Sequence, residues 1–418
     1  MTTLKASACL IGATLARALN GLAVLKVLAV HTSPTDFGQL AQIMGVIALS
    51  GMLAAGGIGN GLTRQLAASQ SELEQSRWLL VALKIYLVAS VLLAVLLLAG
   101  AWSLARWLLE DIGYTPVFVA LAAGQALVGA STLSQAVAAA RGNYGFILRI
   151  AGIGAVVGVL VVGVGVWLGG VVGGALALVI NAALPGLVAI AIKRQALAKL
   201  AGRVGERVAR SDIALLLNYA GIAMLGAASL TVSQIASRNL VGKTLGWDAV
   251  GFWQAVARIS DVYMQLISIA LMSYVLPKLS RIDGFKSMHP ELLRLTGALC
   301  ATFLFAAMFI YSLREFLISL LFSVEYLPAA GLLPIQLLGD LFRLIAVCLS
   351  VALIARGLTR TSMIYETVQG ILTFALTAAL LDGSGISAPL QAYCLTYAIL
   401  MAWLLWVYLA QLRYSGSL

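Results

Sequence analysis

Residues 250–281 read VGFWQAVARISDVYMQLISIALMSYVLPKLSR, a stretch apolar enough to cross a lipid bilayer as a helix. Arg258 and Asp261 nevertheless lie well inside it. Gln254 and Gln265 flank this charged pair. A charged side chain at the bilayer centre costs about 3 kcal/mol on insertion scales. A chain that keeps such charges must use them for packing or for function.

The composition is that of an integral membrane protein. Of 418 residues, 61% are hydrophobic and only 10% are charged, and the mean hydropathy is +1.00, whereas soluble proteins carry about 25% charged residues. The net charge of +11 comes mainly from basic residues at the ends of apolar runs, so it does not indicate nucleic-acid binding. The four cysteines lack the spacing of a metal site or a disulfide framework, so no metal site is predicted.

Runs of about 20 apolar residues suffice to cross the hydrocarbon layer as helices. The sequence predicts twelve such spans, near 7–29, 38–62, 78–101, 115–139, 146–167, 170–192, 212–236, 249–276, 291–313, 330–355, 361–381 and 388–411. Of the 27 Lys and Arg residues, 18 fall at inner loops and ends if the N-terminus is inside, four fall in outer loops and five fall within spans. This asymmetry predicts that both termini are cytoplasmic.

The longest hydrophilic segment divides the chain into two halves. It predicts an N-terminal six-helix bundle at 1–192, a basic cytoplasmic linker at 193–211 and a C-terminal six-helix bundle at 212–418. Six spans in each half give both halves the same orientation, as in parallel repeats. TDFGQLAQ at 35–42 and DAVGFWQA at 248–255 open the second helix of each half.

Polar residues form stripes on several predicted spans. Gln254, Arg258, Asp261 and Gln265 follow i, i+4, i+7 and i+11, which places them on one helical face. The 330–355 span has a similar stripe of Gln336, Asp340 and Arg343, and Glu366 begins another on the 361–381 span. Ionisable residues at membrane depth usually line a polar interior or a substrate pathway.

Basic side chains outnumber acidic ones within the spans. The basic residues are Arg17, Lys26, Lys84, Arg258 and Arg343, and the acidic residues are Asp261, Asp340 and Glu366. A cationic surplus suits an anionic substrate, and the planar guanidinium matches phosphate oxygens. Arg17 and Lys26 are about half a turn out of phase, so either Gly21 marks a kink or Lys26 snorkels to the outer surface.

These residues make up the candidate site. The candidate substrate-binding residues are Arg17, Lys26, Lys84, Arg258, Arg343, Gln254, Gln265 and Gln336. Asp261, Asp340 and Glu366 are candidates for ion coupling or salt bridges. The alternative is structural, because Arg258–Asp261 and Asp340–Arg343 have the i, i+3 spacing of pairs that neutralise each other.

Several segments resemble the Wzx flippases of lipid-linked oligosaccharides, and among them the lipid III flippases of enterobacterial common antigen. They are WDAVGFWQAVARISDVYMQ at 247–265 with YVLPKLSR at 274–281, KASACLIGATLARALNGLAVLKVLAV at 5–30, GGIGNGLTR at 56–64, LLGDLFRL at 337–344 and LQAYCLTY at 390–397. By this resemblance, Asp261, Asp340, Arg343, Glu366, Arg17 and Lys26 match charged positions of the family, whereas Arg258 and Lys84 have no counterpart.

The resemblance implies a fold and an activity. The fold is that of the multidrug/oligosaccharidyl-lipid/polysaccharide exporter superfamily: an all-α integral membrane protein with two six-helix bundles around a central cavity that opens alternately to each side. The implied substrate is an oligosaccharide on undecaprenyl diphosphate, moved to the outer leaflet of a bacterial inner membrane for surface polysaccharides such as O-antigen. The implied partners are membrane lipids and the polymerase and chain-length regulator of the pathway. No cofactor is expected, since a membrane potential or an ion gradient would drive transport.

Two other functions compete with this interpretation. A multidrug cation antiporter of the same superfamily should have a cavity dominated by acids, which the basic surplus opposes. A membrane-embedded polysaccharide polymerase or glycosyltransferase should have a substantial outer loop, and the predicted outer loops are short. His31 and His289 lie in predicted loops without a partnered nucleophile, and the sequence contains no Walker-type phosphate loop. The sequence therefore predicts a transporter and not an enzyme.

Overall fold

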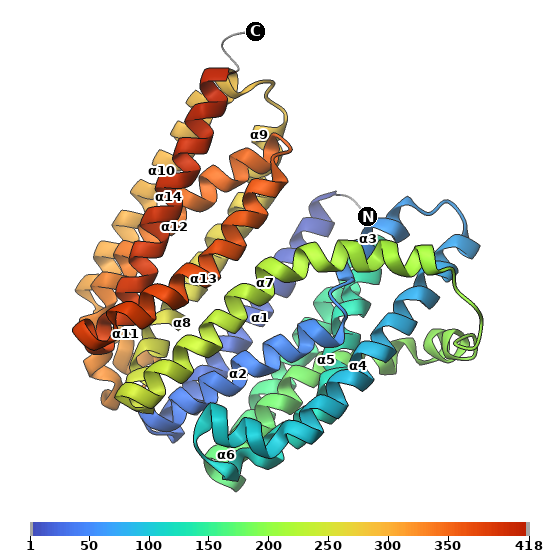
Figure 1. Cartoon of the computed structure of the whole chain (residues 1–418), viewed down its shortest axis with the longest axis horizontal. Helices are drawn as coiled ribbons and strands as arrows, with labels where there is room; N and C mark the ends of the chain where they lie inside the picture. The colour runs from blue at the N-terminus through green and yellow to red at the C-terminus, as the bar shows by residue number, and fades with distance from the viewer. Residues whose placement is uncertain (1–2, 415–418) are drawn as a thin grey trace. The chain divides into compact units, whose positions relative to one another are not determined.

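The computed structural model describes residues 3–414, and within that range the chain is helical, without a β-strand (Figure 1). Nine segments of this range are long and apolar enough to cross a membrane. Two of the nine, Tyr144–Ala201 and Thr359–Arg413, contain two helical arms each. The more polar α7 lies at the remaining predicted span. The predicted all-α, twelve-span membrane fold is confirmed.

The helices follow the predicted spans with a few breaks. The first part of the chain forms α1 (Thr3–His31), α2 (Pro34–Ala54), α3 (Gly59–Ala68), α4 (Glu72–Leu109), η1 (Ile112–Tyr114), α5 (Thr115–Ala140), α6 (Tyr144–Ala201) and α7 (Arg210–Leu245). The second part forms α8 (Trp247–Ala270), the π turn η2 (Leu271–Val275), α9 (Leu276–Ser280), α10 (Phe285–Ser312), α11 (Arg314–Leu321), η3 (Val324–Leu332), α12 (Leu333–Ala355), α13 (Thr359–Ser384), η4 (Gly385–Ser387) and α14 (Ala388–Tyr414).

The span predicted at 38–62 lies within the apolar segment Pro34–Ala68, but a turn interrupts its helix. Gly56 and Gly57 have φ angles of +61° and +63°, so the chain leaves the helix between α2 and α3. Glycine adopts this left-handed region without the steric penalty of a Cβ atom. The interruption leaves α3 as a separate short helix of 10 residues.

The α6 segment is a helical hairpin that turns at Gly170. Its arms run antiparallel, because a Cβ atom at Gly158 would meet Asn181 and one at Gly154 would meet Pro185. Gly170 has φ +56° and ψ −142°, a conformation available almost only to glycine. The turn confirms the predicted boundary between the fifth and sixth spans.

The second half of the chain repeats several backbone features of the first. The α5 and α12 helices end in the same C-terminal turn at Arg141-Gly142 and Arg356-Gly357, 215 residues apart (356 minus 141), with φ +65° and +79° at the two glycines. The hairpin glycine Gly170 also has its counterpart 215 residues later, at Gly385, with φ +52° and ψ −131°. These equivalences support the predicted parallel repeat.

The chain forms two compact units whose boundaries differ from the predicted linker. Residues 1–32 and 39–231 form the N-terminal unit, and residues 33–38 and 232–418 form the C-terminal unit. The first part of α7 belongs to the N-terminal unit, because Leu216 and Ala220 are buried against Ile58 and Trp78. The division therefore falls inside α7 rather than at 193–211.

A close helix crossing within the C-terminal unit explains why residues 33–38 belong to it. A Cβ atom built at Gly38 would lie 2.2 Å from the carbonyl oxygen of Trp247. Reciprocally, a Cβ atom at Gly251 would lie 2.1 Å from the carbonyl oxygen of Pro34. Backbone touches backbone in both directions, which only glycine permits. Gly38 and Gly251 are the matching glycines of the two repeated sequence motifs.

Gly38→Ala and Gly251→Ala are each expected to lower the melting temperature of the purified protein, because overpacking at such a contact costs about 1–3 kcal/mol. The double variant should lower the melting temperature by less than the sum of the two single effects, because one separation of the two helices relieves both clashes. Gly21→Ala in α1 is the control, because a Cβ atom there meets nothing within 4 Å. Equal melting temperatures for Gly38→Ala and Gly21→Ala would contradict the close crossing.

Candidate functional site

The centre of the C-terminal unit holds a fully buried carboxylate. Asp340 in α12 is 0% exposed. It accepts hydrogen bonds from the hydroxyls of Ser260 (2.8 Å), Tyr263 and Tyr393 (2.6 Å), and from the Gln336 amide (3.3 Å). All four partners are neutral donors, so they satisfy a carboxylate without a direct ion pair. The hydroxyl groups can also rotate to accept, so the same cage accommodates a protonated carboxyl group.

Arg343 reaches this carboxylate through a tyrosine. Its guanidinium donates to the Tyr393 hydroxyl at 3.2 Å and lies 5.7 Å from the centre of the Tyr397 ring. The two rings pack edge to face at 4.7 Å, and Gln369 donates to the Tyr397 hydroxyl at 2.6 Å. Aromatic faces attract the guanidinium and hold it without neutralising its charge. Asp340 and Arg343 therefore belong to one network, with Tyr393 between them.

Arg258 and Asp261 form the other i, i+3 pair of the unit. Their side chains meet at 3.2 Å and are 27% and 55% exposed, respectively. Arg238 in α7 is 4% exposed and lies within electrostatic reach of both members of the pair. Arg238 is one of the four basic residues that the charge count assigned to outer loops, but in the structure it lies within α7 and is buried. Arg238, Arg258 and Arg343 are thus three arginines within electrostatic reach of Asp261 or Asp340.

Arg17 belongs to a polar cavity in the N-terminal unit. Its guanidinium donates to Gln135 at 2.7 Å, and Gln135 donates to Ser131 at 3.0 Å. The cavity has a volume of about 80 Å³, and Asn20 and Asn181 also line it. A polar space of this size has room for ordered water. Arg17 is thus held among amides and a hydroxyl, on a different unit from Arg258 and Arg343.

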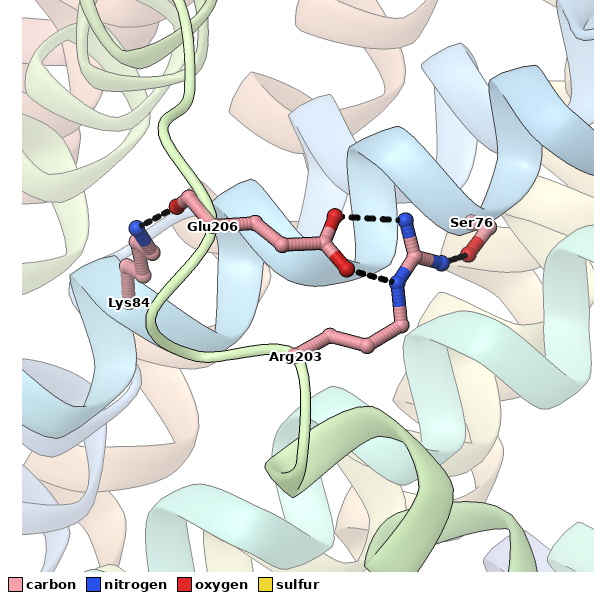
Figure 2. A network of polar contacts seen from close by, with 4 residues as sticks. All are labelled: Ser76, Lys84, Arg203 and Glu206. Atoms are coloured by element: carbon pink, nitrogen blue, oxygen red, sulfur yellow. Dashed lines mark hydrogen bonds and ion pairs between the residues drawn. The ribbon is translucent and has the colours of Figure 1, made fainter.

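The other candidate residues have different surroundings. Gln254 and Gln336 are buried at 2% and 3% exposure. Gln265 and Glu366 are exposed, and Lys26 is half-buried in α1. The interpretation of Lys84 as a substrate ligand is not supported by its contact, because its ammonium group donates to the backbone carbonyl of Glu206 (Figure 2).

Lys84 is part of a clamp that fastens the central linker to α4. Arg203 donates to both carboxylate oxygens of Glu206, at 2.6 and 2.8 Å, and to the Ser76 hydroxyl (Figure 2). The Arg203 guanidinium lowers the pKa of the Glu206 carboxyl, because its hydrogen bonds favour the charged form. The ion pair therefore persists above the usual Glu value of 4.5 and is lost only as the pH falls below it.

Arg77 extends this clamp to the start of α7. It donates to both oxygens of Asp212, one at 2.6 Å, and Asp212 is only 5% exposed.

Arg77→Ala is expected to lower the free energy of unfolding by about 1 kcal/mol, because it leaves the buried Asp212 carboxylate without its partner. The effect is no larger because Arg77 itself is half exposed, so that solvent screens the pair. The measurement is the melting temperature of the full chain. Arg207→Ala, an exposed neighbour in the linker, should change it little.

Sequence reasoning missed the hydroxyl partners of Asp340 and Arg343. Tyr393 and Tyr397 have i, i+4 spacing in α14, which places both on one face of the helix. That spacing was the available signal. Tyr263 and Ser260 lie beside the polar stripe of α8 without belonging to its i, i+4, i+7 register. Their contact with Asp340 depends on the packing of α8 against α12.

The repeat identifies the position in the first half that corresponds to Asp340. Counting back 215 residues leads to Gln125 in α5, next to Gly124, the counterpart of Gly339. Gln125 is 1% exposed and donates to the carbonyl oxygen of Ser90 at 2.8 Å. Both repeats thus bury a polar side chain at this position, and the C-terminal unit alone has a carboxylate there.

Comparisons with known proteins agree with this fold. The polysaccharide biosynthesis protein family matches residues 27–331. The chain is 28% identical, over 96% of its own length and 96% of theirs, to proteins named lipid III flippase from Escherichia coli (strain K12) and Shigella flexneri. These relatives confirm the resemblance to flippases of lipid-linked oligosaccharides.

Two solved structures share the fold at low sequence identity. One is a multidrug resistance MATE family transporter of the MOP superfamily, inward-facing, with a TM-score of 0.81 and 13% identity over 96% of each chain. The other is the lipid II flippase MurJ in an inward closed conformation, with a TM-score of 0.74 and 14% identity over 99% of this chain and 91% of that one. The polysaccharide biosynthesis protein family matches more than half of this chain, so the chain belongs to that family.

Proposed function

We propose that the protein is a flippase that moves an undecaprenyl-diphosphate-linked oligosaccharide, similar to lipid III, from the inner to the outer leaflet. The observation that carries the proposal is Arg343, whose guanidinium contacts the Tyr393 hydroxyl and the Tyr397 ring instead of a carboxylate. The buried Arg238 and the partly buried Arg258 belong to the same unit. The lipid III flippases to which the chain is similar over 96% of its length support the same substrate class. The protein is a transporter and not an enzyme.

The chemistry of such a substrate matches the residues. The sugar and diphosphate cannot cross hydrocarbon unaided, because burying polar and charged groups in it is costly. The polyprenyl tail can remain in the lipid. Arg343 is poised for a phosphate, because its charge is held by aromatic rings and a hydroxyl rather than cancelled by a direct carboxylate contact. The exposed amide of Gln265 is suited to hydrogen bonds with sugar hydroxyls, whereas Gln254 and Gln336 are buried and Gln336 is bonded to Asp340.

The driving force follows from the charge of the substrate. With the inside negative, outward movement of each negative charge is favoured by about 2.3 kcal/mol per 100 mV. An ion gradient can add to this through Asp340, whose cage accommodates either protonation state. Asp261 and Glu366 are the other coupling candidates. The inner membrane is the proposed location, with both termini cytoplasmic, and the polymerase and chain-length regulator of the pathway are the proposed partners.

The test uses the full chain in a bacterial strain that lacks its lipid III flippase. Restored surface polysaccharide, together with translocation of a fluorescent undecaprenyl-diphosphate trisaccharide by the purified protein in liposomes, is expected. Drug resistance without restored polysaccharide would instead support the cation antiporter. Activity in neither assay, at normal membrane levels of the protein, would contradict the proposal.

A further inference from the structure

A large cavity in the N-terminal unit lies outside the residues assigned to the substrate. It has a volume of about 810 Å³, within the roughly 300–1,000 Å³ typical of small-molecule sites. Its walls come from the start of α4, the end of α5 and the end of the α6 hairpin. These are the ends that the distribution of basic residues assigns to the cytoplasmic side.

The cavity is polar at its outer end and apolar in depth. Its basic lining residues are Arg141, Lys193, Lys199 and Arg203, with Glu72 as the one acidic lining residue. Arg141 caps α5, Lys193 lies at a kink within α6, Lys199 lies in the last turn of α6, and Arg203 follows that helix. Along α4 the lining runs from Glu72 to Tyr86, about 21 Å at 1.5 Å per residue. The lining residues farther along the helices from these charged ends include the apolar Leu83, Ala130, Leu133 and Ile190.

A short amphipathic helix forms one side of the opening. The α6 helix kinks at Lys193, where φ is −105° and ψ is +16°, and the helical residues 194–201 follow. Leu197 and Leu200 line the cavity, and Arg194 points to solvent. A basic amphipathic helix beside a membrane span is typical of the lipid–water interface.

The linker clamp fixes the other side of the opening. Arg203 and Ser76 both line the cavity, and their hydrogen bond joins the linker to α4 (Figure 2). Arg203 is also paired with Glu206. Lys193 lies 5.3 Å from the centre of the Phe146 ring, and Lys199 is exposed. Within the described part of the chain, neither lysine is joined to a carboxylate, and Arg141 reaches only the Gln75 amide oxygen, at 3.5 Å.

We propose that this cavity binds an anionic phospholipid of the cytoplasmic leaflet, with the phosphate at Lys193 and Lys199 and one acyl chain along α4. A basic pocket between membrane helices on the cytoplasmic side is a recognised site for such headgroups. The apolar depth requires a hydrocarbon chain, so inorganic phosphate alone does not complete the site. This site lies wholly within the N-terminal unit and goes beyond the proposed transport function. The bound lipid would hold the linker and the α6 hairpin together.

The test measures lipid binding to the purified full chain by native mass spectrometry, with phosphatidylglycerol and phosphatidylcholine as probes. The wild type should retain phosphatidylglycerol preferentially. Lys193→Gln with Lys199→Gln should weaken that binding about 25-fold, since each basic residue near a lipid surface contributes about a factor of five. Arg281→Gln with Lys286→Gln removes the same charge from exposed positions of the C-terminal unit and is the matched control.

A second pair of variants tests the apolar part without changing charge. Ala196→Trp places an indole at the opening, whereas Ala198→Trp places it on the same exposed helix away from the cavity. Only Ala196→Trp should reduce lipid retention. An equal loss of phosphatidylglycerol binding in the Lys193→Gln/Lys199→Gln variant and in its control would overturn the proposal. So would equal competition by inorganic phosphate, or retention of undecaprenyl phosphate in preference to phosphatidylglycerol, which would make the cavity a substrate site.

Discussion

Arg343→Ala is expected to reduce transport of the lipid-linked oligosaccharide by about 30-fold or more while leaving the amount of membrane protein unchanged. A hydrogen bond to a charged group contributes about 1.5–3 kcal/mol, and each 1.4 kcal/mol corresponds to a factor of ten in affinity. Arg343 is the cation that Tyr393 and Tyr397 hold in place. Its removal therefore takes away a charge that is already oriented. Translocation in liposomes and restored surface polysaccharide in cells are the two measurements.

The Arg343→Lys variant distinguishes the effect of the positive charge at this position from the effect of the planar shape of the guanidinium. Lysine keeps the positive charge but cannot form the paired, planar contact with phosphate oxygens, so we expect partial recovery. Arg360→Ala, at the exposed start of α13, is the control and should retain activity. Arg203 is unsuitable as a surface control, because it is engaged in the linker clamp. Full transport by Arg343→Ala at normal protein levels would remove Arg343 from the substrate site.

The membrane fold could be predicted from local sequence because the bilayer constrains it strongly. Apolar length alone located the spans, since any segment in hydrocarbon must satisfy its own backbone hydrogen bonds. The break at Gly56 and Gly57 was missed, because glycine is compatible with a packed helix as well as with a left-handed turn. The same ambiguity was resolved correctly at Gly170, where two full spans could not fit in one helix.

The candidate site was predicted less completely, because it depends on contacts between distant segments. The polar stripe identified Asp340 and Arg343, and their i, i+3 spacing left a direct pair between them as the alternative. The structure instead inserts Tyr393, a residue 53 positions from Asp340 along the chain. Lys84 was identified by its charge, yet its partner is a carbonyl oxygen in the linker, 122 positions away. The spacing of polar residues within one helix cannot reveal a hydrogen-bond partner that lies in a distant segment of the chain.

Asp340→Asn is expected to abolish the response of transport to an imposed ion gradient. The carboxylate is 0% exposed and is surrounded by donors that can reorient, so a proton exchanged there would rearrange the links from α12 to α8 and α14. Asparagine cannot exchange that proton. The repeat supports the same role, because the equivalent position in the first half has the non-titrating Gln125.

The comparison variant is Asp261→Asn, because Asp261 is half exposed and paired with Arg258. It should lower transport less than Asp340→Asn, since water can replace the lost contact. The assay measures translocation in liposomes with and without a proton or sodium gradient, alongside the melting temperature. Asn introduces an amide donor among the four donors around Asp340, so some loss of stability, about 1–3 kcal/mol, is expected. A folded Asp340→Asn protein that still responds to the gradient would show that the carboxylate only joins α8, α12 and α14. The membrane potential acting on the diphosphate would then be the remaining driving force.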